Sequence, residues 1–382
     1  MVIKTYNIQL QMSDATKRHW MSLLAQTRDA FNTCANMVTS AHTQLAMVAV
    51  HAQCYNVLRE EYPQIPSQGI IRVQKSVLAA LRAIRSNEQH NAETPQKKSL
   101  SLQLDKRLYS NLSINGISLS NGIPQKREQC TFVLYDKVID MFNRYVPKDP
   151  TLFIRGDRVF LSVPFEVPSL PCNGDTAIGV DLGMRRFFVT SEGASFVDKD
   201  YLMRRRKVRY LKSRLKSNGT HSAKRHLQKV SHKEHNMSKD QVNKACDLLL
   251  KSTDANILVL EDLSNIKEKT SKTKDGFKRK KHNNAFSQVP LYLFKERLTH
   301  KAQLVGKRVE TVSPAYTSQT DSRTNKRDGI RKGCNYVCSD GVVLDADWNA
   351  AVNIARRANH PLSSSFLPLS GRVQSITQTL KA

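Results

Sequence analysis

The sequence is poor in acidic residues and has no long apolar run. Only 33 Asp and Glu residues stand against 60 Lys and Arg residues in a chain of 382, which leaves a formal net charge of +27. Such an excess repels itself in a compact protein and is best tolerated when a polyanion such as nucleic acid neutralises it. Because no stretch of about 18 apolar residues is present, we expect a soluble, intracellular protein without a membrane partner. The length argues against a single small binding module.

Cysteines are few and scattered. The seven cysteines are an odd number spread over the whole chain, which does not indicate a disulfide framework. Most are expected to be reduced core residues. Only Cys334 and Cys338 lie close enough to each other in the sequence to raise the question of a metal site.

Three patterns follow one another along the first 172 residues. Residues 1–12 alternate apolar and polar side chains as a strand does, and residues 13–99 carry mainly helical patterns. Residues 100–172 form short β-like runs separated by Gly, Pro, Asn and Asp, with a hairpin turn predicted at Gly156–Asp157. We expect the N-terminal strand to complete this sheet, so that the helices form an insertion into a β module.

Positive charge is concentrated further along the chain. Residues 201–300 hold 25 Lys and Arg against 9 Asp and Glu, an excess of 16 in about a quarter of the sequence. Because clustered cations bind phosphates, we take candidate nucleic-acid contacts from this block, from an earlier helix and from a later loop. The candidates are Arg72, Lys75, Arg204, Arg205, Arg206, Lys278, Arg279, Lys280, Lys281 and Arg323. For Arg72 and Lys75, a solvated helix face is the competing interpretation.

Three acidic residues stand at the ends of regular elements. Asp181 and Glu261 each close a short apolar strand, and Asp347 lies at the start of the helix DWNAAVNIARR. Taken singly, each acid fits an N-cap or an ion pair, and spacing alone does not bring the three together. If they converge, they repel one another, and divalent cations relieve that repulsion in two-metal phosphodiester hydrolysis. For the neighbouring Asp262 and Asp345 we expect capping or supporting roles.

The segments around these acids resemble a known family. IGVDLGMRRFFVTS, ILVLEDLSNI and DADWNAAVNIARR are similar to the three motifs of the RuvC-like nuclease domain in TnpB proteins, the insertion-sequence-encoded relatives of type V CRISPR effectors. SQVPLYLFKERLTHKAQLVGKRVETVSPAYTSQT resembles the part of the family that precedes the third motif. The resemblance is specific over about residues 175–357, and the rest of the chain agrees in the order of its elements.

This resemblance implies a multidomain α+β fold. It assigns 1–12 and 100–172 to a split β-barrel wedge domain, 13–99 to a helical recognition insertion, 173–312 and 342–360 to an RNase H-like (RuvC) α/β nuclease domain, 313–341 to a degenerate zinc-ribbon-like insertion and 361–382 to a flexible C-terminal tail.

The resemblance also implies a function. The expected enzyme is a transposon-encoded, RNA-guided endonuclease that cuts double-stranded DNA next to a short flanking motif. Asp181, Glu261 and Asp347 are then the catalytic ligands of two Mg²⁺ ions, for which Mn²⁺ can substitute. The expected partners are a guide RNA derived from the transposon end and the target DNA, bound by a monomer. The resemblance also implies a cytoplasmic, nucleoid-associated protein of a prokaryote.

One departure from the family concerns zinc. The family carries two CxxC pairs before the third acid, and the corresponding positions here hold Asp321, Thr324, Cys338 and Gly341, with Cys334 out of register. Because tetrahedral zinc needs four protein ligands of the thiolate, imidazole or carboxylate type, we expect no structural zinc.

Three alternatives to a guided nuclease stay open. A guide-loaded DNA-binding protein or transposition accessory factor without cleavage activity would tolerate the missing zinc ligands. A structure-selective nuclease without a guide would not need the first half of the chain. A general basic RNA-binding protein would explain the charge but not the placement of the three acids.

Overall fold

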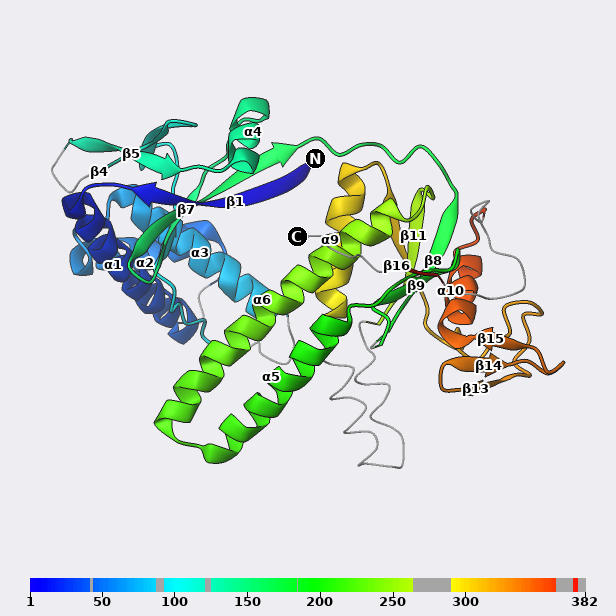
Figure 1. Cartoon of the computed structure of the whole chain (residues 1–382). Helices are drawn as coiled ribbons and strands as arrows, with labels where there is room; N and C mark the ends of the chain where they lie inside the picture. Colours follow the sequence, from blue (N-terminus) through cyan, green and yellow to red (C-terminus); the bar gives the residue numbers. More distant parts are fainter. Residues whose placement is uncertain are drawn as a thin grey trace. The chain divides into compact units, whose positions relative to one another are not determined.

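The chain folds into two compact units, Met1–Val167 and Pro168–Ala382. The structure is a computed structural model that describes residues 1–41, 44–86, 93–120, 125–183, 185–263, 290–361 and 374–376 (Figure 1). The α+β class expected from the sequence is confirmed. The predicted contacts Lys278, Arg279, Lys280 and Lys281 lie outside the described residues.

Within the described part of the first unit, seven strands form a sheet in the order β2-β6-β7-β1-β5-β4-β3. β1 is central, since it pairs with β7 from Val2↔Val167 to Gln9↔Phe160 and with β5 on its other side. The N-terminal strand therefore completes the sheet, as predicted, and Gly156, at φ 64°, forms the predicted turn between β6 and β7. The strands are β1 (Val2–Gln11), β2 (Ser101–Gln103), β3 (Tyr109–Ser113), β4 (Gly116–Ser120), β5 (Arg127–Val133), β6 (Thr151–Arg155) and β7 (Arg158–Val167).

Three long helices come between β1 and β2 in the chain. The Ser13 side chain caps the first of them by accepting a hydrogen bond from the Thr16 backbone N–H at 3.3 Å. Glu128 of β5 accepts a bond from the Ser13 backbone N–H at 2.7 Å and so ties the helix start to the sheet. The helices of this unit are α1 (Asp14–Ser40), α2 (Met47–Glu61), α3 (Ser67–Arg85) and, after β5, the short α4 (Asp136–Arg144).

The second unit contains a mixed sheet whose described strands follow the order β12-β11-β8-β9-β10-β16. The neighbours β8 and β11 are parallel, as are β11 and β12, whereas β9 is antiparallel to β8. The strands are β8 (Ala177–Leu182), β9 (Phe188–Thr190), β10 (Ala194–Phe196), β11 (Ile257–Glu261), β12 (Arg308–Val312) and β16 (Gln374–Ile376). Strand β16 pairs with β10 at Ala194↔Gln374, so the expected free tail is tied to the sheet at residues 374–376.

Helices cover both faces of this sheet (Figure 1). Because side chains alternate along a strand, Ile178 and Leu258 face α6 and α9, while Ala177 and Ile257 face α10. Both central strands are therefore buried on both sides, which accounts for their continuous apolar sequences. The helices are α5 (Lys199–Asn218), α6 (His221–Lys251), α9 (Leu291–Leu304) and α10 (Ala346–Arg357).

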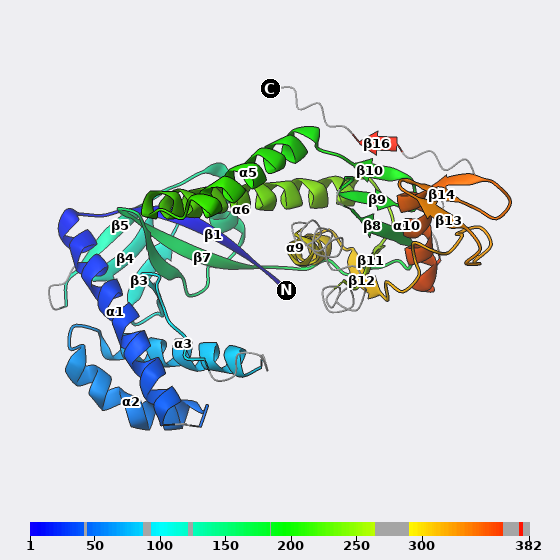
Figure 2. The same ribbon diagram turned by 90° about the horizontal axis from the view of Figure 1, so that it is seen from below.

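The basic helices α5 and α6 form an antiparallel hairpin (Figure 2). Gly219, at φ 68°, ends α5, and the Thr220 side chain caps α6. Along α5 only Tyr201 is buried, and its many cations are exposed or half-buried.

The remaining described strands form a small antiparallel sheet in the order β13-β14-β15. They are β13 (Ile330–Lys332), β14 (Asn335–Val337) and β15 (Val343–Asp345), and β15 leads directly into α10. We call residues 313–345 the ribbon. Within the described part of the chain, no helix combines the length and apolarity needed to cross a membrane.

Gly179 permits the close approach of α10 to β8. A Cβ at this position would lie 1.9 Å from the Ala351 carbonyl oxygen and 2.5 Å from the Ala355 backbone nitrogen. We predict that Gly179→Ala lowers the free energy of unfolding by roughly 3 kcal/mol or more, because backbone must move to admit the methyl group. Gly219→Ala, where no atom lies within 4 Å of the added Cβ, should cost only about 1 kcal/mol for its positive φ. Denaturant unfolding of the two variants tests this, and equal losses would contradict it.

Candidate metal centre

Two of the predicted acids end neighbouring parallel strands. Leu260 of β11 is paired with Val180 of β8. The next residue along each of these two strands is an acid, Glu261 in β11 and Asp181 in β8. Because parallel strands end at the same edge of a sheet, the register brings these carboxylates together although 80 residues separate them in the sequence.

The third acid reaches the same edge from α10. Asp345 caps this helix by accepting hydrogen bonds from the backbone N–H groups of Asp347 and Trp348 at 3.1 and 3.0 Å, the capping role expected from the sequence. Asp347 therefore lies in the first helical turn, and α10 packs against β8 at Gly179. We call Asp181, Glu261 and Asp347 the acid cluster.

Electrostatic coupling shows that the three acids are close. Burial raises the pKa of Asp181 well above its usual range, and repulsion by Glu261 and then by Asp347 raises it further, whereas Arg331 and Arg186 act in the opposite direction. No hydrogen bond to the Asp181 carboxylate is found among the residues that the structure describes. Asp181 is thus a largely buried acid without a compensating donor, and a cation beside it would favour its ionised form.

Two arginines bind Asp347. Arg186 donates to one Asp347 oxygen through Nε at 3.0 Å and through a terminal nitrogen at 2.6 Å, and it also forms two bonds to Asp345 at 2.7 and 2.8 Å. Arg331 of β13 donates to the other Asp347 oxygen at 2.7 Å. Burial opposes the charge of Arg186, but the bonds to both aspartates raise its pKa. Arg186 is the less exposed of the two, with 17% of its side chain accessible against 39% for Arg331.

The first loop of the ribbon positions Glu261. The Thr317 hydroxyl donates to the Glu261 carboxylate. The amide of Asn353 on α10 holds this loop by donating to the carbonyls of Thr317 and Thr320 at 2.9 and 2.7 Å. Burial raises the pKa of Glu261, while the Thr317 bond partly offsets that effect. The roles of Thr317 and Asn353 were not predicted from the sequence. Asn353 was signalled only by its polar side chain in an otherwise apolar stripe of α10, and Thr317 lies in a loop that gave no such signal.

The acid cluster fits a hard divalent cation in donor type and charge. Carboxylate oxygens are the ligands that Mg²⁺ prefers, and the uncompensated Asp181 is a position where a cation would be favourable. In the described residues, however, no three His, Cys, Asp or Glu side chains are arranged to hold a metal ion. Both Asp347 oxygens are bonded to guanidinium groups instead, so metal binding would require the more exposed Arg331 to leave.

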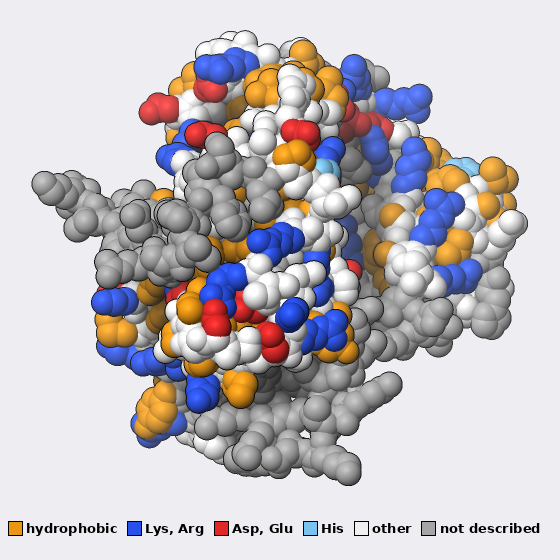
Figure 3. Space-filling view, turned by 90° about the vertical axis from the view of Figure 1, so that its right-hand side faces the viewer, with side chains coloured by type: hydrophobic (Ala, Val, Ile, Leu, Met, Phe, Trp, Pro, Cys, Tyr) orange, Lys and Arg blue, Asp and Glu red, His pale blue; other side chains and the backbone are white. Residues whose placement is uncertain are grey.

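Beside Glu261 a cavity of about 1430 Å³ opens between α5, α6 and α9. Its lining combines apolar residues with cations of α5, including Arg205, Arg209, Lys212 and Lys216. Of the predicted contacts Arg204, Arg205 and Arg206 on this helix, only Arg205 lines the cavity. Lys and Arg side chains are also spread over the face drawn in Figure 3, where Asp and Glu side chains are fewer.

Two of the predicted nucleic-acid contacts form ion pairs inside the protein. Arg72, with only 16% of its side chain exposed, forms an ion pair with Asp149 at 2.8 Å inside the first unit. Arg323 pairs with two aspartates of the ribbon. Both remain predicted nucleic-acid contacts, and the sequence did not reveal that Arg72 has a partner 77 residues away. Lys75, by contrast, is exposed on α3.

Comparisons with known proteins agree with the resemblance noted in the sequence. The family model "Cas12f1-like, TNB domain" matches residues 292–354, from α9 into α10. No curated protein matches the chain. The fold is similar to that of Cas12f1 in the structure "Cryo-EM structure of the Cas12f1-sgRNA-target DNA complex", with a TM-score of 0.56 and 14% identity, over 89% of this chain and 81% of that chain.

Two further structures are similar at TM-scores below 0.5. One is "Structure of the mini-RNA-guided endonuclease CRISPR-Cas_phi3", with a TM-score of 0.42 and 12% identity, over 94% of this chain and 93% of that chain. The other is "Crystal structure of AacC2c1-sgRNA-extended non-target DNA ternary complex", with a TM-score of 0.44 and 11% identity, over 82% of this chain and 62% of that chain. The likeness to type V effectors, relatives of TnpB, is thus confirmed at the level of the fold and of the matched segment.

Arg186 should contribute strongly to stability. We predict that Arg186→Gln lowers the free energy of unfolding by about 2–3 kcal/mol, because it leaves Asp345 and Asp347 close together without their shared cation. Arg185→Gln is the matched control, since Arg185 is exposed and donates only to the Cys334 sulfur at 3.2 Å. It should change stability by less than about 0.5 kcal/mol. Equal effects in denaturant titrations would show that Arg186 is not structurally important.

Proposed function

We propose that this chain is an RNA-guided endonuclease that cuts double-stranded DNA, with a RuvC-like second unit whose acid cluster is the catalytic centre. The observation that carries the proposal is the convergence of Asp181, Glu261 and Asp347, from three distant segments, at one end of a buried sheet. Each motif that resembles the TnpB family supplies one of these acids. The similarity in fold to Cas12f1 supports the same proposal.

The acid cluster would hold two Mg²⁺ ions, which when bound supply an activated water and stabilise the leaving oxygen. The chain's own residues orient the ligands. Arg186 fixes one oxygen of Asp347, so that only the oxygen now bonded to Arg331 becomes available when that side chain moves. Thr317 fixes the Glu261 carboxylate from the ribbon side. The three acids are only partly exposed, and this partial burial strengthens each of these interactions.

The proposed partners are a guide RNA from the end of a transposable element and a DNA target chosen by pairing with it. In such complexes the protein reads backbone and helix shape rather than bases, which suits an excess of cations. A flanking DNA motif would be read by the protein itself. Sequencing the RNA that copurifies with the protein, followed by cleavage of a plasmid library randomised beside a matching target, identifies both partners.

A second candidate function is guide-dependent DNA binding without cleavage. The two guanidinium groups on Asp347 favour it, because they neutralise this acid without any metal ion. The two functions differ in one measurement. A nuclease cuts the matched target in Mg²⁺ or Mn²⁺, whereas the alternative binds the same target and leaves it intact in both.

Loss of any acid of the cluster should abolish cutting. We predict that Asp181→Asn, Glu261→Gln and Asp347→Asn each lower the cleavage rate more than about 100-fold, since losing even an outer-shell partner of a metal ligand costs about 10–100-fold. Binding of the guide RNA should persist, because these acids make no phosphate contacts. Asp254→Asn, an exposed acid in the same unit, is the control and should cut normally. Cleavage by purified Asp181→Asn protein would refute the assignment.

The cations of the cavity should contact phosphates. We predict that Arg205→Gln combined with Lys216→Gln reduces the slope of log K against log salt concentration for nucleic-acid binding by about 1.4–1.8, since each lost phosphate contact removes about 0.7–0.9. Lys233→Gln combined with Lys251→Gln removes the same charge from exposed positions of α6 that do not line the cavity. This control should change the slope less. Identical slopes for both pairs would show that the cavity does not meet the polyanion.

A further inference from the structure

The ribbon has little apolar core of its own. Each of its strands is only three residues long, and a sheet of this size needs packing against other elements or a cross-link to be stable. Tyr336, Cys338 and Leu344 pack toward α10 and β9, but the long connection from residue 313 to β13 contains no strand or helix among the described residues. Something other than apolar packing must hold that connection.

The residues present do not fit a structural zinc ion. Of the four positions that align with zinc ligands in the resembling family, Thr324 and Gly341 offer no thiolate, imidazole or carboxylate. Cys338 is buried, and its thiol is hydrogen-bonded to Asp321. Cys334 is exposed and bonded to Arg185.

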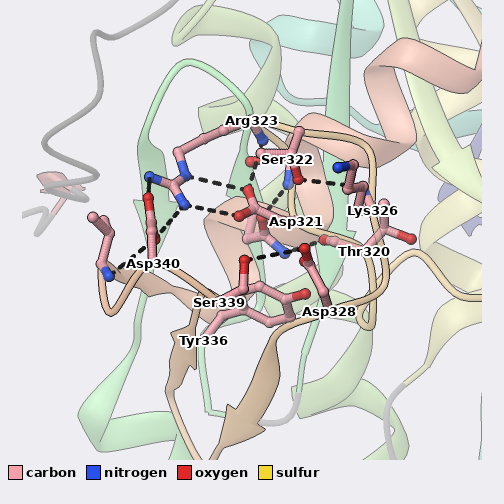
Figure 4. A network of polar contacts seen from close by, with 12 residues as sticks. Thr320, Asp321, Ser322, Arg323, Lys326, Asp328, Tyr336, Ser339 and Asp340 are labelled. Atoms are coloured by element: carbon pink, nitrogen blue, oxygen red, sulfur yellow. Dashed lines mark hydrogen bonds and ion pairs between the residues drawn. The ribbon is translucent and has the colours of Figure 1, made fainter.

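Three charged side chains of the ribbon meet in one network of polar contacts (Figure 4). Asp321 is completely buried, and its carboxylate accepts bonds from the Arg323 guanidinium at 2.9 and 3.3 Å and from the Arg323 backbone N–H at 2.8 Å. The other side of the same guanidinium forms two bonds of 2.9 Å to Asp340. We call Asp321, Arg323 and Asp340 the charge clamp.

The charge clamp cross-links the two ends of the ribbon. Asp321 and Arg323 precede β13, whereas Asp340 follows β14 and also accepts a bond from the Val342 backbone N–H at 3.2 Å. Next to the clamp, the Tyr336 hydroxyl donates to the Gln319 carbonyl at 3.0 Å. The clamp therefore closes the same loop that two ligand pairs would close around a metal ion.

We propose that the charge clamp takes the place of a structural metal ion, so that the ribbon folds and remains ordered without zinc. Bidentate arginine–carboxylate pairs are directional enough for this role, and the buried Asp321 has no other cation beside it among the described residues. Removing Arg323 would leave that carboxylate buried and unpaired, which is strongly unfavourable.

The titration behaviour of the two aspartates supports the clamp. Burial acts to raise the pKa of Asp321, but the bonds from Arg323 and Cys338 bring it below its usual value. Arg323 is also the main cause of the lowered pKa of Asp340. Both carboxylates are therefore ionised at neutral pH, as an ion-pair cross-link requires.

Metal content and chelation test whether the ribbon is ordered without zinc. Elemental analysis of the purified full-length protein should find no stoichiometric zinc, and 1,10-phenanthroline should leave the rate of tryptic cleavage after Arg331 or Lys332, which are both exposed on β13, unchanged. About one zinc ion per chain, or faster cleavage of the ribbon in the chelator, would overturn the proposal. Neither readout depends on nuclease activity, so the proposed function can fail while this inference stands.

Variants of the charge clamp test whether it keeps the ribbon ordered. Arg323→Gln should accelerate tryptic cleavage after Arg331 or Lys332 at least about tenfold, because charged hydrogen bonds of this kind shift a local opening equilibrium by that factor or more. Lys326→Gln is the control, since it removes a neighbouring cation outside the clamp. Asp340→Asn breaks only the outer pair and should give a smaller acceleration, and circular dichroism checks that the variants stay folded. An Arg323→Gln ribbon as resistant as the native one would refute the clamp.

Discussion

Mutual repulsion among Asp181, Glu261 and Asp347 is the constraint around which the second unit is arranged. Parallel pairing of β8 and β11 forces the first two acids together, and the close approach of α10 at Gly179 adds the third. The negative charge of each acid is compensated differently. Asp347 is neutralised by arginines, Glu261 accepts a hydroxyl bond from Thr317, and Asp181 remains uncompensated among the described residues. Because Asp181 is the acid with the least compensation of its negative charge, a cation would be stabilised most beside it.

The same physical device appears twice in the second unit. Arg186 joins Asp345 to Asp347 at the start of α10, and Arg323 joins Asp321 to Asp340 in the ribbon. In both cases one planar guanidinium bridges two carboxylates, a task for which its two edges are suited and the point charge of lysine is not. Some of the positive charge in this protein therefore serves internal architecture, and the net charge overstates the number of cations available to partners.

Local patterns in the sequence predicted much of the fold. Period-two alternation identified β1, and the helical pattern from residue 13 onward identified α1, because both depend on neighbouring residues. The acids at strand ends could be found in the same way, but their convergence came only from the family resemblance, since sequence spacing carries no information on strand order. Arg186 and Thr317 escaped notice because their partners lie 161 and 56 residues away. The internal pairing of Arg72 with Asp149, 77 residues away, was hidden for the same reason.

The central position of β1 bears on how the first unit is made by the ribosome. Its partner β7 begins at residue 158, so at a synthesis rate of roughly 5–20 residues per second the first strand waits on the order of 10–30 s for its longest pairing. During this delay the apolar side chains of Ile8 and Leu10, both buried in the finished sheet, can pack only against segments made before β7, among them β5, which pairs with β1 at Leu10. The central strand of the sheet is thus among the first segments made, whereas the strand that completes its pairing is made last in this unit.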